Sequence, residues 1–176
     1  QVIAKVIAIA IASQRFIQIV TLPITPYLWN VFASCGGTKN TEKKNSLVLG
    51  KARVMVFAVV FLVLCLVIIA YGQNLYLILI FIGISGAAKA WFDPSGLSLQ
   101  RDVLRDATPR LRGVAAAGTE FNWGLASLVG VPISGLLLSI SFTLPFLVLA
   151  VATTIMLVPL TYVLYHTIKQ ENQHGE

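Results

Sequence analysis

Residues Val54–Tyr71 read VMVFAVVFLVLCLVIIAY and contain no charged side chain. Two further stretches, Asn74–Ala88 and Phe121–His166, also lack Asp, Glu, Lys and Arg. A helix that crosses a bilayer needs about 20 mostly apolar residues, because the hydrocarbon core is roughly 30 Å thick. These uncharged runs therefore predict helices that span a membrane.

The composition excludes an ordinary soluble domain. Of the 176 residues, 57% are hydrophobic and 11% are charged, and the mean hydropathy is +0.83. A soluble protein carries roughly 25% charged residues. The net charge of +6 lies in the connections between apolar runs. That placement argues against a nucleic-acid-binding face, and it indicates a lipid bilayer as the partner of the chain.

We predict an all-α fold, a polytopic transmembrane helix bundle with about five spans in a single domain, 1–176. Pro23 and Pro26 interrupt the first span, and proline inside a span is tolerated where neighbouring groups satisfy the freed carbonyls. The predicted spans are 2–32, 53–72, 75–92, 112–139 and 143–166, with connections 36–52 and 93–111 and a tail 167–176.

Lys and Arg give the spans an expected direction. Residues 36–53 hold five of them, and residues 89–112 hold another five. The turns 73–75 and 139–145 hold none. By the positive-inside rule the two basic connections are cytoplasmic. We therefore expect a multi-pass protein of the plasma membrane whose C-terminus is inside the cell.

Small residues, prolines and basic residues around residues 83–135 follow an order found in a known family. The order is Gly83, Gly86-Ala87-Ala88, Pro94, Asp106, Pro109, Arg112-Gly113 and Gly118. The connection Leu47–Arg53 reads LVLGKAR, and Gly50, Lys51 and Arg53 match a degraded Asp-Arg-x-Gly-Arg-Arg motif, with Leu47 at its acidic position. In these features the chain resembles the major facilitator superfamily of transporters. The resemblance covers roughly residues 47–166.

The resemblance implies one half of a two-half transporter. Such transporters rock two six-helix halves around a central site near the membrane midplane. The chain begins at Gln1 inside an apolar stretch, so we expect a fragment whose partner is the missing half. The third span lacks the basic residue that the family carries in its N-terminal half. Spans eight to twelve are thus the expected identity, with spans two to six as the alternative.

Glu120 is the first candidate for substrate or proton coupling, because an acid inside a span costs several kcal/mol unless it has a function or a partner. Arg15 is the second, since it lies near the middle of the first segment and could bind an anionic substrate. Asn122 and Trp123 could line the same cavity. The alternatives are a structural hydrogen bond or ion pair for Glu120, and an Arg15 side chain that extends to the membrane interface.

Two further sets of residues are structural candidates. The resemblance implies a conformational latch of ion pairs, in which residues 101–106 form a short amphipathic helix on the cytoplasmic face. The alternative is a solvated loop. The glycines and Pro132 of the fourth predicted span are expected to let another helix pack closely against it. Gly113 and Gly124 lie on the same face of that span as Glu120. The expected latch residues are Asp93, Arg101, Asp106, Arg112, Lys51 and Arg53, and the expected packing residues are Gly113, Gly118, Gly124, Pro132 and Gly135.

Lys89 and Asp93 are four residues apart on one helix face, so a local ion pair is expected between them. The sequence contains no catalytic constellation, no metal-ligand spacing, no cofactor motif and no phosphate-binding loop. We therefore expect a protein that is not an enzyme. The leading function is secondary transport of a small-molecule substrate, as proton-coupled antiport or efflux. The half match of Gly118, Pro132 and Gly135 to the family's antiporter motif supports antiport. A non-transporting membrane subunit is the alternative.

Overall fold

The structure, a computed structural model, describes residues 2–34, 43–105 and 107–173. All regular structure in these residues is helical, so the predicted all-α fold is confirmed. The elements are α1 (Val2–Thr21), the 3₁₀ turn η1 (Leu22–Ile24), α2 (Thr25–Ser34), α3 (Lys43–Tyr71), α4 (Leu75–Val103), α5 (Pro109–Ile140) and α6 (Leu144–Gln173).

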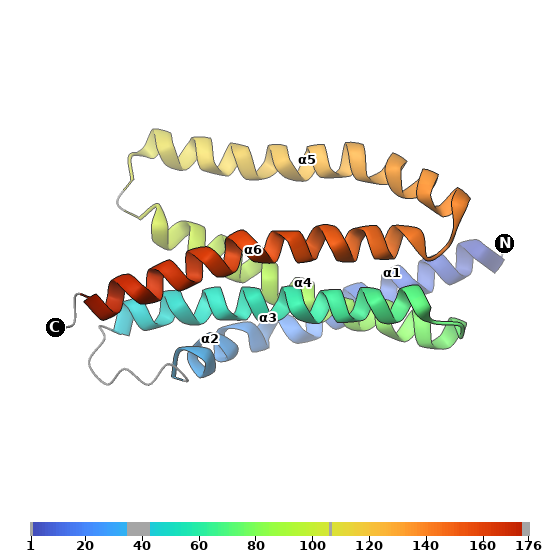
Figure 1. Cartoon of the computed structure of the whole chain (residues 1–176), viewed down its shortest axis with the longest axis horizontal. Helices are drawn as coiled ribbons and strands as arrows, with labels where there is room; N and C mark the ends of the chain where they lie inside the picture. The colour runs from blue at the N-terminus through green and yellow to red at the C-terminus, as the bar shows by residue number, and fades with distance from the viewer. Residues whose placement is uncertain (1, 35–42, 106, 174–176) are drawn as a thin grey trace.

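The described helices are long and apolar enough for a membrane protein. Four of them could cross a bilayer by length and hydropathy, namely 8–34, 47–71, 75–103 and 109–140. A shorter apolar helical stretch covers 144–159. Each of the first four predicted spans overlaps one of the four candidate spans, and the fifth overlaps the shorter stretch 144–159. Figure 1 shows that α3, α4, α5 and α6 run back and forth along the long axis, and that α2 and the last turns of α4 and α6 lie toward the same end.

Proline explains the break between α1 and α2. Pro23 and Pro26 have no backbone N–H, so a regular α-helix cannot continue through them. The chain forms η1 instead, and the Thr25 N–H bonds to the carbonyl of Leu22. Pro94 lies inside α4, yet the helix runs on to Val103. The expectation that a connection begins at residue 93 is therefore wrong for the helix boundary.

The core lies around α3 and α4. Side chains at helical spacing on α3 are buried, including Val54, Ala58, Cys65 and Ile69. Cys65 is a buried free thiol that packs in this core, whereas Cys35 lies outside the described residues. α4 packs most extensively against α3 and α1, and α3 also contacts α6 and α2.

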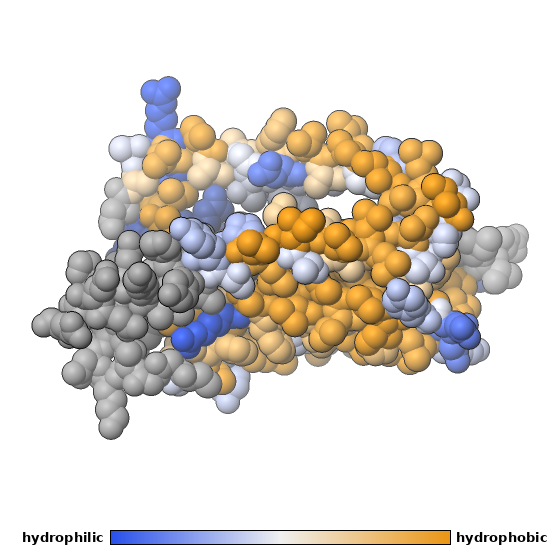
Figure 2. Space-filling view, in the orientation of Figure 1, coloured by the Kyte–Doolittle hydropathy of each residue, from blue (hydrophilic) through white to orange (hydrophobic). Residues whose placement is uncertain are grey.

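α5 stands apart from this core. None of its residues is buried, and its main helix contact is a small one with α6. Figure 2 shows an opening between α5 and the helices beneath it, and large orange areas where apolar side chains face outward. In a membrane such surfaces face lipid or another membrane helix. The described chain is therefore a compact group of helices with one helix largely uncovered.

Candidate functional site

An ion pair joins α3 and α4 near the end of the bundle where α4 terminates. The Lys51 ammonium donates to the Asp102 carboxylate, and it is the one salt bridge among the described residues. Lys51 is only 5% exposed. The same ammonium lies 5.2 Å from the centroid of the Trp29 ring, which is within the range of a cation–π interaction. The buried Lys51 ammonium is thus in contact with both a carboxylate and the face of an aromatic ring.

Asp102 was not among the latch residues that the sequence predicted. Its sequence signal was present, because Asp102 lies one residue from Arg101 in a run of alternating charges. The predicted separate amphipathic helix over 101–106 is wrong, since α4 continues without interruption to Val103. Arg101 and Asp102 therefore belong to the end of a long helix. Asp106 lies outside the described residues.

Arg112 and Arg53 bond to backbone carbonyls. The Arg112 Nε donates to the carbonyls of Leu104 and Ala107, both at 3.1 Å, and its Nη2 donates to that of Arg105. These carbonyls follow the end of α4, where helical donors run out. Arg53 Nη1 donates to the Phe32 carbonyl at 2.8 Å. Arg112 thus holds the backbone just after α4, whereas Arg53 joins α3 to the last turn of α2, and neither forms an ion pair within the described residues.

Arg15, Lys89 and Asp93 bring three charges to facing parts of α1 and α4. Asp93 interacts electrostatically with both Lys89 and Arg15. Arg15 Nη1 donates to Gln18 Oε1 at 3.1 Å, and one position earlier the Gln14 amide donates to Ser85 Oγ at 3.3 Å. All three charged residues lie in candidate membrane spans. Ionisable groups at such positions are functional candidates.

The predicted ion pair between Lys89 and Asp93 is wrong for the described structure, because their charged atoms are not within 4.0 Å. The Lys89 ammonium lies instead 5.0 Å from the centroid of the Trp123 ring on α5. Trp123 is 50% exposed, and so it packs only partly between helices. This contact connects the α1–α4 charges to α5.

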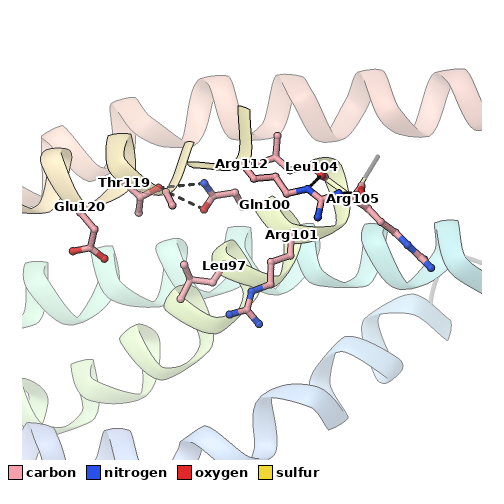
Figure 3. A pocket seen from close by; sticks show the side chains of 9 residues that line it. Leu97, Gln100, Arg101, Leu104, Arg105, Arg112, Thr119 and Glu120 are labelled. Carbon is pink, nitrogen blue, oxygen red and sulfur yellow. Dashed lines mark hydrogen bonds between the residues drawn. The ribbon is translucent and has the colours of Figure 1, made fainter. Parts of the chain in front are cut away.

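Glu120 lines a cavity of about 390 Å³ between the end of α4 and the start of α5 (Figure 3). Gln100 on α4 and Thr119 on α5 bridge the two helices, with the Gln100 amide donating to the Thr119 hydroxyl at 3.3 Å. Figure 3 shows the Glu120 carboxylate beside this bridge, while the Arg112 guanidinium points away toward Leu104. Glu120 is exposed and has no ion pair within the described residues. The remaining lining residues are Leu97, Arg101, Leu104, Arg105, Arg112 and Ala116.

The small residues of α5 do not pack on a neighbouring helix of this chain. A Cβ atom added at Gly113, Gly118, Gly124 or Gly135 would meet nothing within 4 Å. Pro132 is exposed as well. Close packing at these positions is therefore not seen within the described residues, and it stays a prediction for a helix outside them. The tight glycines are Gly50 against α2 and Gly86 against α1.

Asn122 is exposed on α5 next to Trp123, and no hydrogen bond of its side chain is found among the described residues. The described residues contain no group of three His, Cys, Asp or Glu side chains that could hold a metal ion. The site therefore offers charged, amide and hydroxyl side chains inside membrane helices. Such groups can bind a small solute or exchange a proton.

Comparison with known proteins gives the family. A search of curated proteins and a search of solved structures return no match. The family model described as Major Facilitator Superfamily matches residues 46–176, which is most of the chain. The matched region begins near the start of α3 and includes Lys51, Lys89, Asp102 and Glu120. This integral membrane protein belongs to the major facilitator superfamily of transporters.

Proposed function

We propose that the chain forms part of a secondary transporter that moves a small solute by alternating access, with proton-coupled antiport as the coupling mode. The chief support is Glu120, an acid inside a candidate span that lines a cavity and has no ion pair within the described residues. A carboxyl group in that setting can take up a proton on one side of the membrane and release it on the other. Efflux across the plasma membrane is the proposed direction.

The charges on α1 and α4 supply the second part of the proposal. Arg15 and Lys89 together carry two positive charges against the one negative charge of Asp93. The excess positive charge favours an anionic group on the solute. The Trp123 ring on α5 covers the Lys89 ammonium. A solute that enters beside α5 would displace this ring and contact Lys89 itself.

The Lys51–Asp102 pair serves as the latch at the basic end of the bundle, which the proposal places in the cytoplasm with the C-terminus. The pair joins α3 to the last turn of α4, so it can hold one arrangement of these helices and release another. The open face of α5, with Gly113 and Gly124, is the proposed contact with the other half of the transporter. Spans eight to twelve remain the proposed identity of the five segments.

Transport by the full-length protein in proteoliposomes tests the proposal. With an imposed pH gradient, Glu120→Gln should abolish proton-coupled flux while solute exchange without a gradient persists, because the neutral side chain cannot carry a proton. Glu120→Asp keeps the acid and should retain coupled flux. Unchanged coupled flux in Glu120→Gln would show that coupling lies elsewhere.

A non-transporting membrane subunit is the second candidate, and the uncovered face of α5 favours it. Such a subunit would use that face to bind a partner helix and would need no charge inside the membrane. In that case the full-length protein shows no solute flux in vesicles, and Arg15→Gln and Glu120→Gln leave partner binding intact. Solute flux in vesicles would exclude this candidate.

A further inference from the structure

Pro94 breaks the backbone hydrogen-bond ladder of α4, and a side chain from another helix supplies the missing donor. Pro94 has no N–H, so the carbonyl four residues earlier, that of Ala90, lacks its usual helical donor. The Thr25 hydroxyl donates to that Ala90 carbonyl at 3.0 Å. Thr25 is the first residue of α2 and is only 1% exposed. The donor missing from α4 is thus supplied by the residue at which the first segment itself resumes as a helix.

A second contact from α2 lies on the other side of the break. The Trp29 Nε1–H donates to Ser95 Oγ at 2.7 Å, and the Ser95 hydroxyl donates to the Trp91 carbonyl at 2.6 Å. Ser95 is completely buried. Thr25 and Trp29 are four residues apart, so they project from one face of α2. That face therefore bonds to α4 one turn before Pro94, at Ala90, and immediately after it, at Ser95.

Trp29 also contacts the latch. Its ring lies 5.2 Å from the Lys51 ammonium, which in turn pairs with Asp102 at the end of α4. One side chain thereby touches both the break in α4 and the ion pair that holds the end of the same helix. The segment between them, residues 95–103, also carries Gln100, which bonds to α5. Its direction is fixed at both ends by contacts that involve α2 or α3.

We propose that Thr25 and Trp29 are positioning residues that fix the direction of α4 after Pro94 and so aim residues 95–103 at the latch and at α5. The inference rests on the proposed transport function, in which those residues change position between states. Thr25 and Trp29 both lie outside the family match, since that match begins at residue 46. Loss of the Thr25 hydroxyl leaves the buried Ala90 carbonyl unpaired, and loss of the Trp29 N–H removes the bond that Ser95 accepts; either loss frees the segment beyond the break.

The distance across the break provides the test. Spin labels at Tyr76 and Arg101, both exposed, lie 25 residues apart on α4, or roughly 37 Å along a straight helix. They are placed in the full-length protein with Cys35 and Cys65 replaced by Ser. Thr25→Val removes the hydroxyl at constant size and should shift the balance of bent and straighter forms roughly fivefold, as expected for one hydrogen bond. Thr25→Ser keeps the hydroxyl and should give the wild-type distribution.

A double-mutant cycle separates positioning from simple packing. Pro94→Ala restores an N–H that can bond to the Ala90 carbonyl, so Thr25→Val should cause no further shift in that background. An equal shift in both backgrounds, or none in either, would overturn the proposal. If Thr25→Val does not yield folded protein, Trp29→Phe is measured in the Pro94 background alone. It removes the N–H that bonds to Ser95 while keeping a ring over Lys51, so it should shift the distances, and an unchanged distribution would overturn the proposal. The measurement of spin-label distances does not depend on solute flux. It therefore still tests this proposal if the protein proves not to transport.

Discussion

At Gly86 the backbone of α4 lies close against that of α1, and Gly86→Ala should separate the two helices. A Cβ atom at this position would lie 2.2 Å from the Gln14 carbonyl oxygen and 3.0 Å from its carbon. Real Cβ atoms essentially never come within 3.0 Å of such atoms, so the backbones must part by at least 0.8 Å. The contact is with backbone, and no side-chain rotation can relieve it.

The cost follows from this geometry. Forced overpacking of a tight contact destabilises by about 1–3 kcal/mol. The Gln14–Ser85 hydrogen bond is already 3.3 Å long and would be lost, which costs about 0.5–1.5 kcal/mol more. Ala is the better helix former by about 1 kcal/mol, which offsets part of the loss. We expect a net loss of about 1–3 kcal/mol and a fall in apparent Tm of roughly 3–10 °C.

Heating the purified protein in detergent, followed by size-exclusion chromatography of what remains folded, measures this fall. Gly124→Ala is the matched control, because its Cβ would meet nothing within 4 Å. It should leave the apparent Tm unchanged or slightly raised. If Gly86→Ala is as stable as Gly124→Ala, the close approach of α1 and α4 is not present in the protein, and the reasoning fails.

Three further outcomes are expected. Asp102→Asn leaves the buried Lys51 ammonium without its acid and should lower the free energy of unfolding by about 2–3 kcal/mol. Lys51→Met should lower it less, because Asp102 is partly exposed. The same heating assay compares the two variants, and equal losses would contradict the assignment of Lys51 as the buried partner. Arg112→Leu leaves the carbonyls after α4 without donors, so limited trypsin digestion should cut at Arg105 several-fold faster, while Arg110→Leu, at an exposed neighbour, should not change that rate. Gly124→Leu should not alter the stability of this chain alone but should lower its recovery in complex with the other half; equal recovery would remove α5 from the proposed contact.

Most of the fold could be predicted because it depends on hydropathy and charge. The uncharged run from Val54 to Tyr71 lies within α3, and the uncharged turn at Gln73 and Asn74 separates α3 from α4. The end of α4 could not be placed in this way. Pro94 normally favours a helix end, but Thr25 supplies the missing hydrogen bond from 65 residues away in the chain. No local pattern shows a donor so distant in sequence.

The candidate site was predictable only in part, for a related reason. Lys51, Arg112 and Glu120 were recognisable because charged residues near or inside spans are few. Their partners were not, because partner choice depends on which helices meet. Lys89 on α4 contacts Trp123 on α5 and does not pair with Asp93, which is one turn away on its own helix. Lys51 pairs with Asp102, which is 51 residues distant in the chain. Helical spacing alone predicted the nearer partner for Lys89.

The isolation of α5 has a consequence for the biogenesis of the protein. A newly inserted α5 carries Glu120 and Asn122 into the bilayer without cover from the helices made before it. Polar side chains inside a bilayer are costly until they meet a partner or a polar cavity, so this helix is expected to settle late. The short turn at 141–143 ties α5 to α6, so the two enter as a hairpin. Assembly of this hairpin is thus expected to be the slowest step in maturation.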